Sequence, residues 1–108
     1  MKQDVIKPLA DIDLVSAVAF YEKEKRTLGQ RFLKEFRLLV ISICRNPGIG
    51  SQRYSHLIPG LRVRHIAGFP YLVLYLERDA AIEVIRVLHI RRDLPAALEE
   101  VEPESQSD

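Results

Sequence analysis

The sequence is poor in cysteine, has no tryptophan and contains no long hydrophobic run. Its single cysteine, Cys44, falls in an apolar helical pattern, so we expect it to serve packing; disulfides and cysteine-based metal sites within the chain are excluded. No stretch approaches the roughly 18 consecutive apolar residues of a membrane helix. The opening residues, MKQDVIKPLADID, carry acids and a proline where a signal peptide has its apolar segment. We therefore expect a cytoplasmic protein without membrane contact.

Motifs for metals, phosphates and nucleotides are missing as well. His56, in RYSHLIPG, has no partner at a metal-ligand spacing, and the other two histidines do not form a compact ligand set with it. The chain has no P-loop, no glycine-rich dinucleotide fingerprint and no Ser/His/Asp order. The sequence thus predicts neither a metal site nor a cofactor.

The distribution of charge divides the chain into two parts. The 108 residues fit one domain and carry a net charge of +1. The last ten residues hold five acids and no base, so residues 1–98 carry 16 bases against 10 acids, an excess of six positive charges. We predict a folded, moderately basic domain over 1–98 that favours an anionic partner, and an acidic, disordered tail over 99–108.

Two helices are predicted in the first half. In DLVSAVAFYEKEK, from Asp13, apolar residues recur on one helical stripe, and Asp13 is the expected N-cap. Gly29 is expected to end this helix or to link it to a second one, QRFLKEFRLLVISICR (30–45), which NPGIG ends. Two helices joined by so short a turn pack as an antiparallel hairpin.

Three strand candidates follow, joined by connections of hairpin length. They are LRVRHIA (61–67), YLVLYLE (71–77) and AIEVIRVLHI (81–90). The second is apolar on both faces, as expected of a central strand. Near the N-terminus, DVIKPL reads as a short strand that Pro8 restricts to an edge or a strand end, and LPAALEEV adds one or two helical turns.

The predicted fold class is therefore α+β, in the order β-α-α-β-β-β with a short C-terminal helix. A helical hairpin packs on one face of an antiparallel sheet. The other face, or its rim, is left to solvent or to a partner.

This order and several motifs resemble the RelE/ParE superfamily of bacterial toxins from type II toxin–antitoxin systems. In the first predicted helix the motif is DL with a tyrosine further along the same helix (Asp13, Leu14, Tyr21). The second helix contributes RFLKEF and its end NPGIG, and the strands contribute GLRVRHIAGFPYLVLY followed by IEVIRVLHIRRDL, so that the resemblance covers residues 5–94. RVLHIRRD after FPYLVLY is more similar to the ParE-like branch. The resemblance implies a toxin held inactive in a hetero-oligomer by a cognate antitoxin, whose C-terminal segment wraps it.

The resemblance also implies two different activities. ParE-like toxins inhibit DNA gyrase, and RelE-like toxins are ribosome-dependent mRNA endoribonucleases. We expect gyrase inhibition by protein–protein contact, with the endoribonuclease acting on ribosome and mRNA as the alternative; the superfamily also has members of weak toxicity or unknown target. Residues 50–98 contain no lysine and no tyrosine follows Tyr75, which weakens the nuclease interpretation, although His89 keeps it open.

The arginines of the first predicted hairpin strand are candidate binding residues. A period of two places Arg62 and Arg64 on one face with Ile66. They either face solvent, contact an antitoxin or target, or clamp a phosphate bidentately. If the protein is a nuclease, Arg62, Arg64 and His89 are its expected catalytic residues, because arginine cannot take a proton and histidine can.

In the last strand, regular alternation places Ile82, Val84, Arg86, Leu88 and Ile90 on one face. His89 then lies on the opposite face from Arg86, which counts against a catalytic pair unless a bulge intervenes. Because an unpaired buried charge is costly, we assign Arg86 a structural role in an ion pair or a contact with carbonyls, with Asp13 as the second structural charge.

The end of this strand is strongly basic. Arg91 and Arg92 follow it directly, and we predict that they form a basic surface where the C-terminal segment meets a target or antitoxin. The alternative is that they are solvated charges at a strand end with Asp93 as an intramolecular partner.

Overall fold

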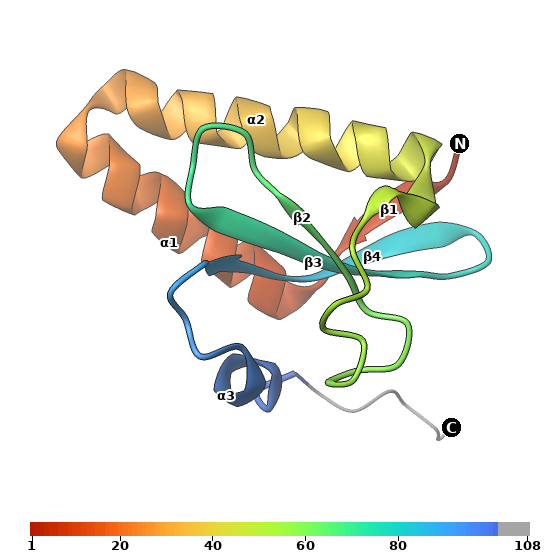
Figure 1. Cartoon of the computed structure of the whole chain (residues 1–108). Coiled ribbons are helices and arrows are strands. Elements are labelled where there is room, and N and C mark those ends of the chain that lie inside the picture. Colours follow the sequence, from red (N-terminus) through yellow and green to blue (C-terminus); the bar gives the residue numbers. More distant parts are fainter. Residues whose placement is uncertain (102–108) are drawn as a thin grey trace.

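The computed structural model describes residues 1–101; most of the predicted disordered tail, residues 102–108, lies outside the described residues. The elements, in chain order, are β1 (Gln3–Ile6), α1 (Pro8–Glu24), α2 (Arg26–Arg45), the short 3-10 helix η1 (Pro47–Ile49), β2 (Arg62–His65), β3 (Tyr71–Glu77), β4 (Ala81–His89) and α3 (Leu94–Leu98). The predicted α+β order is confirmed. Helices α1 and α2 form a hairpin along one side of the sheet, and α3 lies on the other side (Figure 1).

The four strands form one sheet in the order β1-β4-β3-β2. Strands β2, β3 and β4 make the predicted antiparallel meander, with β3 inside the sheet. Strand β1 lies at the edge, as the proline after it predicted, but it pairs with β4 in parallel, so the sheet is mixed. Parallel pairing is possible because the helical hairpin separates β1 from the meander and lets the two strands run in the same direction.

Helix α1 begins six residues earlier than predicted, at Pro8 rather than after Asp13. Proline suits the first turn of a helix, because its fixed φ is helical and the N–H that it lacks would have no partner there. Lys7 is the N-cap residue, and the N-cap role predicted for Asp13 is wrong. Asp13 instead lies inside the helix, where its side chain is free for another role.

The prediction that Gly29 ends α1 or links the two helices is wrong, because Gly29 lies buried inside α2. A Cβ atom at this position would lie 3.0 Å from the carbonyl oxygen of Val18, and closer still to Cγ of Glu22. The glycine therefore lets α1 and α2 approach each other closely near their connection.

Apolar cores cover both faces of the sheet. The helices pack over the first face, with Phe32 and Phe36 of α2 against Val73 of β3. On the second face, Leu74 of β3 and Leu94 of α3 belong to another core. The prediction that this second face is left to solvent or a partner is therefore wrong where α3 and the loop before β2 cover it.

A bulge in β4 changes which side chains share a face. Leu74 lies opposite Arg86, yet Tyr75 lies opposite Val84, so β4 carries one extra residue at this point. Val84 consequently packs in the core beneath the helices and Leu88 in the core beneath α3. The single face predicted for these two residues is wrong, because regular alternation does not anticipate a bulge.

Candidate partner-binding sites

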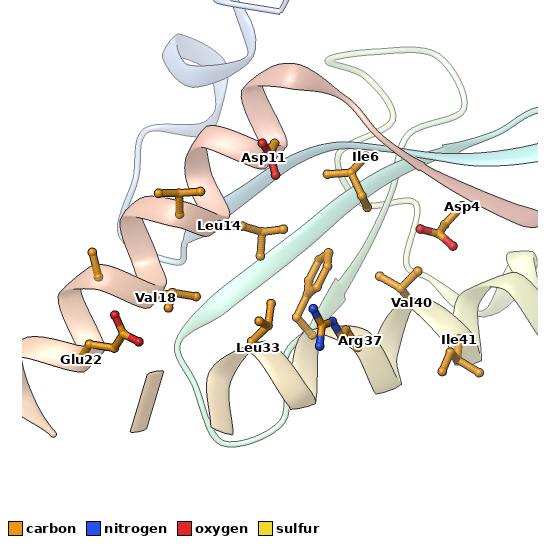
Figure 2. Close-up of a pocket in the computed structure, with 13 residues that line it drawn as sticks. Asp4, Ile6, Asp11, Leu14, Val18, Glu22, Leu33, Arg37, Val40 and Ile41 are labelled. Atoms are coloured by element: carbon orange, nitrogen blue, oxygen red, sulfur yellow. The ribbon is translucent and has the colours of Figure 1, made fainter. Parts of the chain in front are cut away.

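A groove of about 620 Å³ runs between α1 and α2 and reaches β1. Figure 2 shows the charged side chains of Asp11 and Glu22 on α1 and of Arg37 on α2 around apolar side chains such as Leu14 and Leu33. The α1 residues that line it span about 16 Å at 1.5 Å per residue. The groove therefore matches the length of about three turns of an incoming helix.

Exposed apolar side chains border this groove. Val15 of α1 is 64% exposed and Ile41 of α2 is 41% exposed, and both line it. Helix α1 also exposes Ile12 and Phe20, so apolar residues are spread around the helix rather than confined to its core stripe. Val15 and Ile41, which line the groove, indicate a second packing partner there. Their apolar character is visible in the sequence, but prediction of the core stripe alone overlooks it.

Arg86 forms a buried network with α1 and α3. Its Nε and Nη2 donate to the two carboxylate oxygens of Asp13 at 2.8 and 2.9 Å, and its Nη1 donates to the carbonyl of Ala97 at 2.7 Å. Glu100 accepts a longer bond of 3.4 Å from the same Nη1. Arg86 thus makes both kinds of contact considered for it, an ion pair and a carbonyl contact.

Asp13 also closes the edge of the sheet. Its Oδ2 accepts a hydrogen bond of 2.9 Å from the backbone N–H of Val87, on β4 beyond the end of β1. The hydrogen bond from Arg86 to Asp13 raises the pKa of the guanidinium above its ordinary value, against the opposing effect of burial. The Asp13 carboxylate therefore neutralises the buried guanidinium of Arg86 and accepts a backbone N–H at the strand edge. Both residues thus have a structural role.

Tyr75 and Arg62 hold the segment after α2 against the sheet. The Tyr75 hydroxyl donates to the carbonyl of Pro47 at 2.7 Å and accepts from the N–H of Gly50 at 2.9 Å. Arg62 Nη1 donates to the carbonyls of Gly50 at 2.8 Å and of Gly48 at 3.2 Å. Sequence analysis missed these bonds because they join residues far apart in the chain.

We expect Tyr75→Phe to lower the free energy of unfolding by about 1–3 kcal/mol, because it leaves the buried N–H of Gly50 without its partner. Burial raises the pKa of Tyr75, so the folded state holds this proton more tightly than the unfolded state. The stability that this provides is complete below about pH 10, the unfolded pKa, and is lost as the pH rises through the folded pKa.

Urea unfolding above and below pH 10 measures both effects. Wild type should lose more stability at alkaline pH than Tyr75→Phe, although Tyr21 and Tyr71, whose pKa values burial also raises, retain part of the effect in both proteins. Tyr54→Phe, in which the hydroxyl removed has no hydrogen bond among the described residues, is the matched control. Equal alkaline losses in Tyr75→Phe and wild type would contradict the assignment.

The predicted nuclease residues lie on the same face of the sheet but on strands two apart, Arg62 and Arg64 on β2 and His89 on β4. Arg62 and Arg64 lie on the helix-side face of β2, opposite Tyr75 and Val73. Two strand spacings and two residues along the sheet separate Arg64 from His89, which is about 12 Å between Cα atoms. Arg64 makes no hydrogen bond or ion pair within the described part of the chain.

At the end of β4, His89 packs its ring 5.2 Å from that of Tyr71, measured between centroids. Its Nδ1 accepts a hydrogen bond of 3.1 Å from the N–H of Arg91. Asp93, the intramolecular partner considered for the arginines, instead caps α3 by accepting from the N–H of Ala96 at 3.2 Å. Within residues 1–101, Arg91 and Arg92 are exposed and form no ion pair.

Between residues 1 and 101, no group of three or more histidine, cysteine, aspartate or glutamate residues is placed to hold a metal ion. The described helices include none that is long and apolar enough to cross a membrane. Burial raises the pKa of Cys44, which packs in the core beneath the helices.

Comparison with known proteins first identifies the class of fold. A chain of the chromosomal ParDE TA system from P. aeruginosa superimposes with a TM-score of 0.71 at 16% sequence identity, over 82% of this chain and 96% of that chain. The protein therefore has the helical-hairpin-on-sheet fold found in that toxin–antitoxin (TA) system. No curated protein matches its sequence.

The family follows from the sequence match. The family model of the ParE toxin of the type II toxin–antitoxin system parDE matches residues 5–94. The chain belongs to the ParE toxin family, as the motifs predicted, and membership implies a cognate ParD antitoxin as its partner.

Proposed function

We propose that this ParE-family toxin acts in the cytoplasm, that it inhibits DNA gyrase by protein–protein contact, and that a ParD-type antitoxin neutralises it. The match to the ParE family over residues 5–94 is the observation that carries the proposal. Two exposed arginines at the end of β4 and an open groove on the helical hairpin offer separate surfaces for target and antitoxin.

The contacts of the basic residues favour an inhibitor over an endoribonuclease. RNA cleavage requires cations at the phosphate and a group for proton transfer close to it. Arg62 is bonded to loop carbonyls and Arg86 to Asp13, so a phosphate would have to compete with bonds already formed. His89 already accepts the N–H of Arg91 at Nδ1 and packs its ring on Tyr71, so only its Nε2 is left for proton transfer.

The connection between β4 and α3 is the proposed target surface. Ile90 is 50% exposed and stands beside Arg91 and Arg92. An exposed apolar residue followed by two arginines that form no ion pair within residues 1–101 has the composition of a protein-binding hot spot. Asp93 caps α3 immediately afterwards, so the arginines project from a turn that is fixed at both ends.

We expect the double variant Arg91→Ala/Arg92→Ala to require about tenfold more protein for the same inhibition of gyrase, since each lost arginine contact removes part of the binding energy. The measurement is supercoiling of relaxed plasmid by purified gyrase, with circular dichroism to verify folding. Arg26→Ala/Arg45→Ala, which removes the same charge from exposed positions at the two ends of α2, is the control. Unchanged inhibition by the first variant would exclude this surface.

The same assay tests the proposed function. Inhibition by wild type that added antitoxin reverses would support it. A folded sample that leaves supercoiling unaffected would refute gyrase as the target. Ribosome-dependent mRNA cleavage would then be tested with His89→Ala, because His89 is the candidate for proton transfer.

The groove between α1 and α2 is the proposed antitoxin site. Its apolar floor and its length of about three helical turns fit an amphipathic helix. Acidic residues lie on the α1 side of the groove and Arg37 lies on the α2 side. The antitoxin helix should therefore carry basic residues along its border with α1 and an acidic residue along its border with α2. This arrangement leaves the end of β4 to the target.

A further inference from the structure

Arg64 differs in its contacts from Arg62, Arg78 and Arg86. Arg62 donates to two loop carbonyls, Arg78 to Glu83 at 3.2 Å, and Arg86 to Asp13, Ala97 and Glu100. Within residues 1–101, Arg64 makes neither a hydrogen bond nor an ion pair.

One end of this guanidinium is also buried. Arg64 Nη1 has essentially no contact with solvent and no acceptor in the described structure, although the residue as a whole is partly exposed. A buried charged donor without an acceptor costs free energy, which an incoming acceptor recovers. Because Arg64 makes no bond, its side chain can turn toward such an acceptor without breaking one.

The outer edge of β2 provides a place for a partner beside Arg64. The outward N–H and C=O of Val63 form two hydrogen bonds of 3.0 Å with Ser51. The loop before β2 therefore covers this edge only as far as Val63. The backbone of His65, two residues on, faces the same edge, and no described loop segment bonds to it. An extended segment that pairs here would place alternate side chains on the helix side, next to Arg64.

We propose that Arg64 binds an aspartate or glutamate carboxylate on an extended segment of the antitoxin that lies along the outer edge of β2. This inference rests on the proposed antitoxin partner. It adds a second contact region to the groove between α1 and α2, on the opposite edge of the sheet from β1.

A carboxylate fits this position better than a nucleic-acid backbone. Its two oxygens match the planar guanidinium and can be held bidentately. A phosphodiester chain is bound by a row of free cations, whereas Arg62 is already bonded to carbonyls and His65 points to the opposite face of the sheet. One arginine without a partner among residues 1–101, beside an open strand edge, suits one acidic side chain of a peptide.

The test measures the affinity of the 108-residue toxin for its cognate ParD antitoxin, by isothermal titration calorimetry at low and high salt. We expect Arg64→Met to weaken binding by at least about 30-fold, with a smaller dependence on salt, because a charge pair buried by complex formation is lost. The affinity of Arg64→Lys for the antitoxin should lie between those of wild type and Arg64→Met, since an ammonium group cannot bind bidentately. Arg26→Met, with the same change of charge on exposed α2, should bind as wild type does.

Thermal unfolding of the free toxin separates this role from a structural one. Arg64→Met should melt at the wild-type temperature or above, because it removes an unpaired buried cation and no bond. A large loss of thermal stability in the free variant would assign Arg64 to folding and overturn the proposal.

The remaining outcomes distinguish failure of the Arg64 contact from failure of the proposed antitoxin partner. Wild-type affinity in Arg64→Met overturns the carboxylate contact but leaves the toxin–antitoxin pair intact. Failure of the wild-type toxin to bind overturns the proposed partner and this contact with it. A variant that loses RNA cleavage but binds antitoxin normally would show that Arg64 contacts phosphate, which also overturns the proposal.

Discussion

Replacing Asp13 with alanine is expected to lower the free energy of unfolding by about 3–5 kcal/mol, because the change leaves a buried arginine without its counter-charge. The side chain of Arg86 is 4% exposed and that of Asp13 is 10% exposed, so water cannot substitute for the missing carboxylate. The variant also leaves the N–H of Val87 without its acceptor. Small domains are stable by about 5–15 kcal/mol in total, so much of the stability depends on this one side chain.

Urea denaturation followed by circular dichroism measures this loss. Glu100→Gln is the control on the same arginine: Glu100 is 58% exposed and its bond is 3.4 Å long, so its removal should cost no more than about 1 kcal/mol. In Asp13→Ala/Arg86→Met both charges are gone, and the double variant should be more stable than Asp13→Ala alone. A loss in Asp13→Ala as small as that in Glu100→Gln would show that Arg86 does not depend on the pair.

Placing a charge in the groove between the helices is expected to weaken antitoxin binding by at least about 30-fold, the effect of losing a central interface contact. The proposed variant is Val15→Asp. Val15 is 64% exposed in the free toxin, so folding should be unaffected, but an antitoxin helix in the groove would have to desolvate the new carboxylate. Affinity is measured by titration calorimetry with the complete antitoxin.

The chain offers a closely matched control for this prediction. Ile12 lies on the same helix, is 59% exposed and does not line the groove. Ile12→Asp therefore makes the same chemical change at a comparable surface position and should bind the antitoxin with nearly wild-type affinity. Equal losses in the two variants would mean that the antitoxin covers α1 without using the groove.

Residue periodicity was sufficient to predict the helical hairpin, the three-stranded meander and its central strand. Each depends on patterns within one segment, such as the apolar run 71–77, which forms β3 with the predicted bounds. Local patterns failed where the structure depends on distant residues. Asp13 appears in the sequence as a cap for its own helix, because nothing local shows that Arg86, 73 residues later, needs a carboxylate.

The candidate sites also divide into features set by one segment and features that depend on distant residues. The exposure of Arg91 and Arg92 agrees with a position just after a strand, which the sequence makes plain. The groove depends on how two helices diverge, and the isolation of Arg64 depends on which arginines find partners elsewhere. Neither property belongs to a single segment, and the bulge in β4 shows that even the face of a strand residue can depend on its neighbouring strand.

The pairing of β1 with β4 joins residues 3–6 to residues 81–84. During translation, α1 and α2 can form as soon as they emerge, but the sheet cannot close until the ribosome has released β4. The Arg86 network adds a still later requirement, since it includes the carbonyl of Ala97. We therefore expect this domain to become folded only after Ala97 has left the ribosome, and until then α1 and α2 lack the sheet on which they pack.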